Sequence, residues 1–274
     1  MLQQIVDLQA EAEEFHRLLS ILAAADWPRP TLFKGWTTDD IVQHLHMGDL
    51  MGLASATDPT AFAALLADIQ AHRATGLSRV EEARRRLGDL AGPRLGQQWR
   101  TTLAELCAAL AAKPADARLP WSGPDMGVRM FTTARQMEIW SHAQAIYDLL
   151  GLERPAPSPR LRNIAEIGVR TFGWAYRVRG LDVPPAAPRV SLTTPFGETW
   201  EWNKESPAGT VTGAAIDFCQ VVTQTRNVAD TALQLTGEGA HHWMSIAQCF
   251  AGPPETPPAP GLRRRGARRD DLKR

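Results

Sequence analysis

The stretch MFTTARQMEIWSHAQAIYDLL, residues 130–150, decides the fold, because it predicts a long helix with charged groups on an apolar side. Glu138 and His142 are four residues apart, so they lie on one side of this helix. The rest of that side consists of Phe131, Ala134, Ala145 and Leu149. A carboxylate and an imidazole are costly to bury there without a partner. A metal ion would be such a partner, and a hydrogen-bonded pair in the core is the alternative.

A further metal ligand has to come from another helix, and His44 is the candidate. Thr37 and Asp40 have the spacing of a capping box, which predicts a helix over 38–55. His44 lies on the apolar side of this helix, whereas His46 points to nearly the opposite side. A hydrogen-bonded core histidine is the alternative for His44 alone. Two imidazoles and one carboxylate would leave positions open on a divalent ion such as zinc, iron, nickel, cobalt or manganese.

The first half of the chain is predicted to form a helical bundle. Apolar residues recur at helical spacing over 3–25, and Asp26-Trp-Pro-Arg-Pro ends that helix because proline cannot continue it. Further helices are expected over 38–55, 59–74, 78–113 with an interruption near Gly92-Pro93, and 130–150, with a loop over 114–128. Packing of their apolar sides gives a four-helix bundle over residues 1–152.

The pattern changes after Arg154-Pro-Ala-Pro-Ser-Pro, which is typical of a linker. Apolar and polar residues alternate on both sides of Pro195-Phe-Gly197, and this predicts a β-hairpin. Helices are also expected over 160–179, 213–224 and 239–250, and a strand over 230–236. Together these elements predict a small α/β domain over 158–252. The segment 253–274 is Pro-rich and then basic, so a disordered tail is expected there.

Composition argues against several classes of protein. The chain has 274 residues with 30 Lys plus Arg and 30 Asp plus Glu, so no overall field attracts nucleic acid or an anionic membrane. Its three widely spaced cysteines form no CxxC pair, which suits a reducing cytoplasm. The N-terminus begins as an amphipathic helix rather than a signal peptide, and no apolar run reaches membrane-spanning length. We expect a cytoplasmic monomer or homodimer that acts on a small molecule, without nucleic-acid or membrane partners.

Gly35-Trp36-Thr37, followed by Asp40 and His44-Leu45, resembles the second-helix motif of the mycothiol-dependent maleylpyruvate isomerase family. That family is part of the wider DinB-like metal-binding superfamily. Glu138-x-x-x-His142 resembles the family's second metal motif. The family also carries a C-terminal α/β domain resembling sterol-carrier folds, and this chain changes character near residue 155. The resemblance covers most of the chain.

The resemblance implies a divalent metal, with zinc as the first choice, bound by His44, Glu138 and His142. In the thiol-dependent members the thiol of mycothiol meets the metal and becomes a thiolate, the nucleophilic form. Isomerisation or S-transfer on a small electrophilic substrate would follow. The family also uses an arginine of its C-terminal domain, which implies that Arg226 pairs with a substrate carboxylate. A surface arginine that follows a helix is the alternative for Arg226. A hydrolase or lyase without thiol, and a non-catalytic metal-containing protein that binds a small ligand, are the alternatives.

Three side chains near the candidate ligands have open roles. Arg135 could pair with Glu138, Asp39 or Asp40, although a solvated helix surface is the favoured interpretation. Trp36 and Trp140 flank the ligands in sequence, and we expect both to pack in the core first and to line a pocket second.

Overall fold

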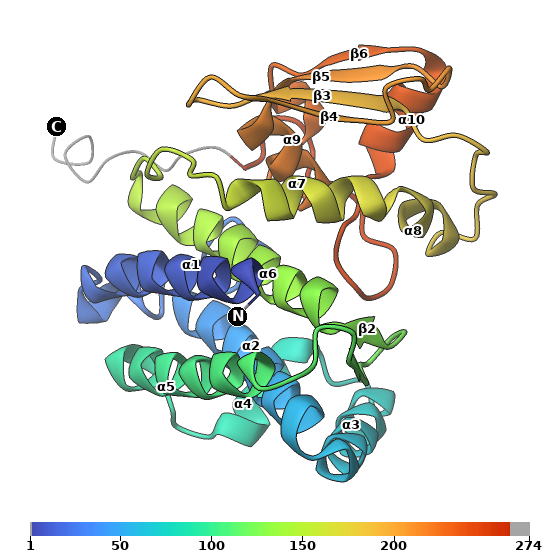
Figure 1. The fold of residues 1–274 in the computed structure, drawn as a ribbon. Helices are drawn as coiled ribbons and strands as arrows, with labels where there is room; N and C mark the ends of the chain where they lie inside the picture. Colours follow the sequence, from blue (N-terminus) through green and yellow to red (C-terminus); the bar gives the residue numbers. More distant parts are fainter. Residues whose placement is uncertain (1, 264–274) are drawn as a thin grey trace, which may run out of the picture. The chain divides into compact units, whose positions relative to one another are not determined.

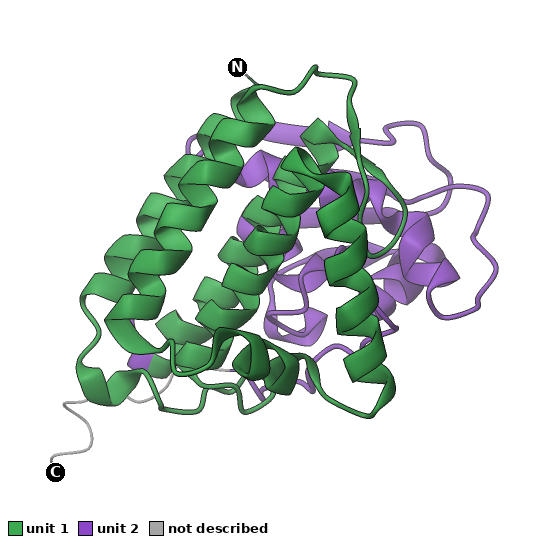
Figure 2. Cartoon of the chain, turned by 90° about the horizontal axis from the view of Figure 1, so that it is seen from below, with its two compact units in different colours: residues 1–149 green, residues 150–274 purple. Residues whose placement is uncertain are grey.

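The computed structural model describes residues 2–263. The chain forms two compact units, Met1–Leu149 and Leu150–Arg274 (Figure 2). The first unit is built from helices and the second combines helices with a four-stranded sheet (Figure 1). This confirms the predicted fold class, a helical bundle followed by a small α/β domain. Among the described residues, no helix combines the length and the apolar character that crossing a membrane requires.

Four long helices make up the frame of the first unit: α1 (Gln3–Ser20), α2 (Thr38–Thr57), α5 (Gly92–Ala111) and α6 (Val128–Leu150). The shorter elements are η1 (Ala24–Asp26), α3 (Pro59–Ala74), α4 (Arg79–Leu87), β1 (Arg118–Leu119) and β2 (Met126–Gly127). The long helices contribute fully buried side chains such as Leu8, Leu45, Trp99 and Phe131 to one core. The strands β1 and β2 form a small antiparallel hairpin inside the segment expected to be a loop.

The start of α2 connects three helices. Thr37 and Asp40 form the predicted capping box, because the Thr37 Oγ1 accepts from the Asp40 amide (3.1 Å) and the Asp40 carboxylate accepts from the Thr37 amide (3.0 Å). Arg84 of α4 donates two hydrogen bonds to the same carboxylate, at 2.8 and 2.9 Å. The Asp39 carboxylate accepts from the amide of Gly92 at the start of α5 (2.7 Å). The residues that begin α2 therefore also fix α4 and α5.

The sheet of the second unit has the strand order β4-β3-β5-β6. Its strands are β3 (Arg189–Thr193), β4 (Thr199–Trp202), β5 (Thr210–Ala214) and β6 (Gln234–Thr236). The predicted hairpin is present as β3 and β4, in which Leu192 pairs with Trp200. The remaining elements are α7 (Leu161–Arg170), α8 (Phe172–Arg177), α9 (Ala215–Val222), η2 (Val228–Asp230) and α10 (Glu238–Ile246). Helix α9 packs against β3 and β5, next to the buried side chains Val190 and Val211.

Two elements of the second unit differ from the prediction. The helix expected over 213–224 begins only at Ala215, because Thr210–Ala214 form the strand β5. This strand runs parallel to β3 in the interior of the sheet. The helix expected over 160–179 is two helices, α7 and α8, that meet at Thr171.

The predicted disordered tail includes residues 253–263, which are instead held by hydrogen bonds within the second unit. The Asn227 side chain donates to the carbonyl of Pro258 (2.8 Å), and the Arg263 guanidinium donates to the carbonyl of Gln224 (2.6 Å). The prediction is therefore wrong for this part of the segment. The rest of the predicted tail lies outside the described residues.

We expect Gly209→Ala to destabilise the second unit more than Gly197→Ala. Both glycines have positive φ, 97° and 84°, so either alanine carries a backbone cost of about 1–2 kcal/mol. Only at Gly209 would the new Cβ collide with a backbone atom, the carbonyl oxygen of Thr236 at the end of β6, whereas Gly197 faces open space. Urea denaturation followed by tryptophan fluorescence measures the two losses. Equal losses would show that close packing at Gly209 does not matter.

Candidate metal centre

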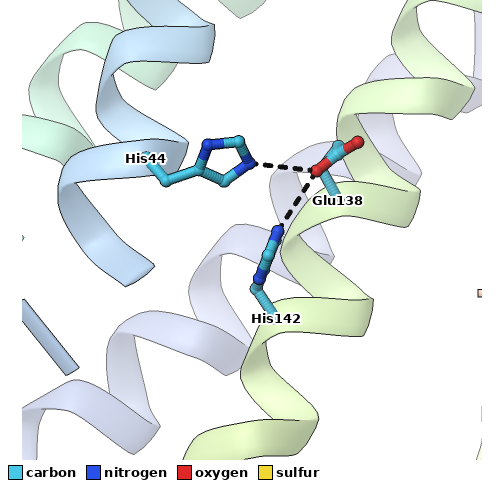
Figure 3. Close-up of side chains that lie close together, drawn as sticks. All are labelled: His44, Glu138 and His142. Atoms are coloured by element: carbon cyan, nitrogen blue, oxygen red, sulfur yellow. Dashed lines mark hydrogen bonds and ion pairs between the residues drawn. The ribbon is translucent and has the colours of Figure 1, made fainter. Parts of the chain in front are cut away.

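The structure brings together the three residues predicted to bind a metal, His44 of α2 with Glu138 and His142 of α6 (Figure 3). The Nε2 atoms of His44 and His142 lie 3.4 and 3.3 Å from the same oxygen, Oε2 of Glu138. One donor atom from each residue lies within 4.8 Å of the other two. The side chains of His44 and Glu138 are 20% and 21% exposed, and that of His142 is 9% exposed. The cluster is therefore sheltered but still partly exposed to solvent.

Aromatic rings enclose the two histidines. The Trp36 ring lies nearly parallel to the ring of His142, with centroids 5.9 Å apart and an angle of 6° between the planes. The same indole meets His44 at 5.3 Å, and Phe33 meets His142 edge-on at 5.0 Å. Trp36 thus lines the site as well as packing against it, whereas Trp140 is 4% exposed and belongs to the core.

A tight turn carries these aromatic rings. The Trp36 amide donates to the carbonyl of Phe33 (2.9 Å), and the two residues between them, Lys34 and Gly35, have φ of 54° and 70°. Positive φ at both central positions defines a type I′ turn. A bridge between Pro30 and Thr37 closes the loop directly before α2. The turn therefore fixes both rings relative to the helix that carries His44.

The surroundings set the protonation states of two candidate ligands. Burial lowers the pKa of His44 to about 4, although the hydrogen bond with Glu138 acts in the opposite direction. Burial alone would raise the pKa of Glu138, but the hydrogen bonds with His142 and His44 hold it well below its usual value. At neutral pH Glu138 is therefore a carboxylate and His44 a neutral imidazole, the forms that bind metal ions.

The structure corrects the interpretation of two neighbouring residues. Arg135 does not lie on a solvated surface, because it is 6% exposed and its Nε donates to the Asp49 carboxylate at 2.8 Å. Its partner is therefore Asp49 and not one of the predicted partners, Asp39 and Asp40. His46, predicted to point to nearly the opposite side of α2 from His44, is 2% exposed, and its Nδ1 has no hydrogen-bond partner among residues 2–263. Burial lowers the pKa of His46 to about 4.

A second group of potential ligands lies close together within residues 2–263, formed by Asp68, His72 and Glu82. Two arginines already neutralise its carboxylates. Arg85 pairs with Glu82 at 3.0 Å, and Arg86 pairs with both acids. These fixed positive charges disfavour a cation at this position. The cluster of His44, Glu138 and His142 is therefore the better candidate.

Arg226 belongs to the second unit, in the segment that follows α9. Gln224 has a φ of 56°, and its side chain donates to the carbonyl of Ala247 (2.9 Å), which holds this strained residue in place. The amide of Arg226 donates to the carbonyl of Gln220 (3.2 Å). A well-bonded turn thus carries Arg226, whose guanidinium donates to the carbonyl of Thr225 (2.8 Å), and its predicted role at the site stays a prediction.

A family model described as the mycothiol maleylpyruvate isomerase N-terminal domain matches residues 8–147, which include all three candidate ligands. The chain belongs to this family. An uncharacterised protein found in two strains of Mycobacterium tuberculosis is 40% identical over 251 residues, which cover 91% of this chain and 96% of that protein. The family membership predicted from the paired motifs is thus confirmed.

Two solved structures resemble the fold over most of the chain. The crystal structure of a mycothiol-dependent maleylpyruvate isomerase has a TM-score of 0.54 at 15% identity, covering 85% of this chain and 92% of that chain. The structure of a histidine mutant of such an enzyme has a TM-score of 0.51 at 16% identity, covering 80% and 87%. At these identities the comparison supports the fold, since both units of the chain are included in the aligned length.

We expect His46 to make the stability of the metal-free protein depend on pH. Its pKa is about 4 in the folded protein against an ordinary value of 6.5, so the unfolded chain binds more protons between these values. The free energy of unfolding should be insensitive to this residue above pH 6.5 and fall toward pH 4. The slope for one such group is at most about 1.4 kcal/mol per pH unit.

The His46→Leu variant lacks this contribution and should lose less stability than the wild type between pH 7 and pH 4.5. Urea denaturation of chelator-treated protein at a series of pH values measures the difference. Since both proteins retain His44, their comparison isolates His46. Parallel pH profiles would show that His46 is not held in its neutral form.

Proposed function

We propose that this chain is a metal-dependent enzyme that uses a low-molecular-weight thiol, mycothiol, as a cofactor or co-substrate. The reaction would be isomerisation of, or S-transfer to, a small electrophilic substrate. The observation that carries the proposal is the convergence of His44, Glu138 and His142 from two helices, in a chain that belongs to a mycothiol-dependent isomerase family.

The spacing of the donor atoms fits a metal ion. Two ligands bound tetrahedrally at about 2.0–2.1 Å from zinc lie about 3.3 Å from one another. The distances from Glu138 Oε2 to the Nε2 atoms of His44 and His142 are 3.4 and 3.3 Å. Direct N–H···O hydrogen bonds are usually shorter, at about 2.9–3.0 Å. The donor set of two imidazoles and one carboxylate also suits zinc and several other divalent ions.

Each residue of the cluster has a distinct role in the proposal. His44 and His142 supply nitrogen donors, and the Glu138 carboxylate offsets part of the charge of the ion. Phe33 and Trp36 cover the imidazole rings and exclude water from that side. A divalent ion held there would act as a Lewis acid that lowers the pKa of a thiol, and the thiolate is the reactive nucleophile.

Arg226 is the proposed recognition group for a carboxylate on the substrate. A guanidinium binds a carboxylate through two parallel hydrogen bonds, which fixes the orientation of the substrate as well as its position. The strained and well-bonded turn at Gln224 supports this role, because it limits the movement of the backbone that presents Arg226.

Purified protein is expected to contain about one divalent ion per chain, and the Glu138→Gln and His142→Ala variants should lose it. Removing one ligand leaves too few donors to hold the ion. Elemental analysis after dialysis measures the metal content. The matched control is His72→Ala, which alters the second cluster and should leave the metal content unchanged. A folded, metal-free wild type, or loss of the ion in the control alone, would contradict the proposed site.

Turnover should require both the metal and a thiol. A panel of small electrophiles that includes maleylpyruvate can be incubated with the wild type, with and without mycothiol, and followed by absorbance. We expect reaction only with thiol present, because the nucleophile comes from the cofactor. The Glu138→Gln variant should be inactive with thiol. Reaction of the wild type without any thiol would replace this proposal by metal-assisted hydrolysis or a lyase reaction.

A further inference from the structure

A buried ion pair lies one helical turn from the candidate ligands. Arg135 of α6 donates from Nε to the carboxylate of Asp49 on α2 (2.8 Å). The other oxygen of Asp49 accepts from the indole nitrogen of Trp99 on α5 (2.9 Å). Asp49 and Trp99 are fully buried and Arg135 is 6% exposed. Three long helices are thus joined at one level of the bundle.

The same arginine contacts the backbone beside a candidate ligand. Its Nη2 donates to the carbonyl of Leu45 (3.2 Å), the residue that follows His44. Along α6, Arg135 precedes Glu138 by three residues, so the two side chains lie on one side of the helix. One guanidinium therefore ties the helix of Glu138 and His142 to the helix of His44.

A glycine makes room for this arrangement. Gly48 lies one turn after His44 on α2, and a Cβ built there would be 2.8 Å from both terminal nitrogens of Arg135. Any larger residue would force the guanidinium to move. Because Gly48 has no side chain, the guanidinium of Arg135 fits against the backbone of α2 at this position.

Stability alone explains this pair poorly. Moving two charges out of water is expensive, and replacement of a buried ion pair by uncharged residues of similar size is often neutral or stabilising. What such a pair does supply is a fixed geometry, because the planar guanidinium must meet the carboxylate and a carbonyl at set angles. This ion pair lies about one helical turn from the three candidate ligands.

We infer that Asp49 and Arg135 position the metal ligands by fixing the distance and rotation between α2 and α6. This inference rests on the proposed metal site. Neither residue is one of the three candidate ligands, so both act as positioning residues through His44 and Glu138. Partners that orient metal ligands typically change metal affinity by about ten- to hundred-fold when removed.

The test removes both charges together in the variant Asp49→Asn/Arg135→Met, in which the Asn oxygen still accepts from Trp99. The probe is Zn²⁺ alone, with its affinity measured by competition with a chromogenic chelator. We expect Zn²⁺ to bind about ten- to hundred-fold more weakly than to the wild type. The urea midpoint of the metal-free variant should change little. The visible absorption of the Co²⁺-loaded variant should also shift, because its coordination geometry changes.

Two further variants keep the test decisive. Arg135→Lys keeps the charge but loses the fork that reaches Leu45, and it should also weaken Zn²⁺ binding. Ser55→Ala removes another buried polar contact of α2, to the carbonyl of Pro120, and serves as the control with unchanged affinity. If the double variant does not fold, Arg135→Lys decides.

Each outcome separates the inference from the proposed function. Unchanged Zn²⁺ affinity and Co²⁺ spectrum in the Asp49 and Arg135 variants, with a wild type that binds Zn²⁺, would overturn the positioning role alone. An equal loss of affinity in Ser55→Ala would also overturn it, since any core change would then suffice. A folded wild type that binds no Zn²⁺ would overturn both the inference and the metal site.

Discussion

A charged side chain inside a helical bundle must meet its partner on another helix, and this constraint organises the first unit. The cost of an unpaired buried charge is several kcal/mol, about as large as the net stability of many domains. Helix α2 carries three groups, one after another along its length, that pair with charged side chains of other helices. Asp40 meets Arg84 of α4, His44 meets Glu138 of α6, and Asp49 meets Arg135 of α6. These polar pairs, together with apolar packing, fix how the helices are positioned along one another.

The features that could be predicted from sequence are those encoded within a few residues. The capping box at Thr37 and Asp40 and the spacing of Glu138 and His142 are local, and the structure contains both. Helical periodicity likewise predicted the four long helices and hence the bundle. The approach of His44 to Glu138 spans 94 residues of sequence, and its prediction needed the paired motifs of the family in addition to periodicity.

Partners across helices and the burial of polar residues could not be derived in this way. Asp49 lies 86 residues before Arg135, and no local pattern joins them. Helix α2 is buried over most of its circumference, so His46 and Gln43 are enclosed although they lie off the apolar side. The strand β5 was missed for a similar reason. It is short, continues directly into α9, and is defined by pairing with β3, which is not visible in its own sequence.

The turn that carries Phe33 and Trp36 limits how the chain can change in length. Two residues, Lys34 and Gly35, separate the rings, and both have positive φ. An insertion or deletion between Phe33 and Trp36 would change the turn type and rotate one ring away from His142. In relatives with a loop of different length before α2, the aromatic rings beside the candidate metal ligands would therefore be arranged differently.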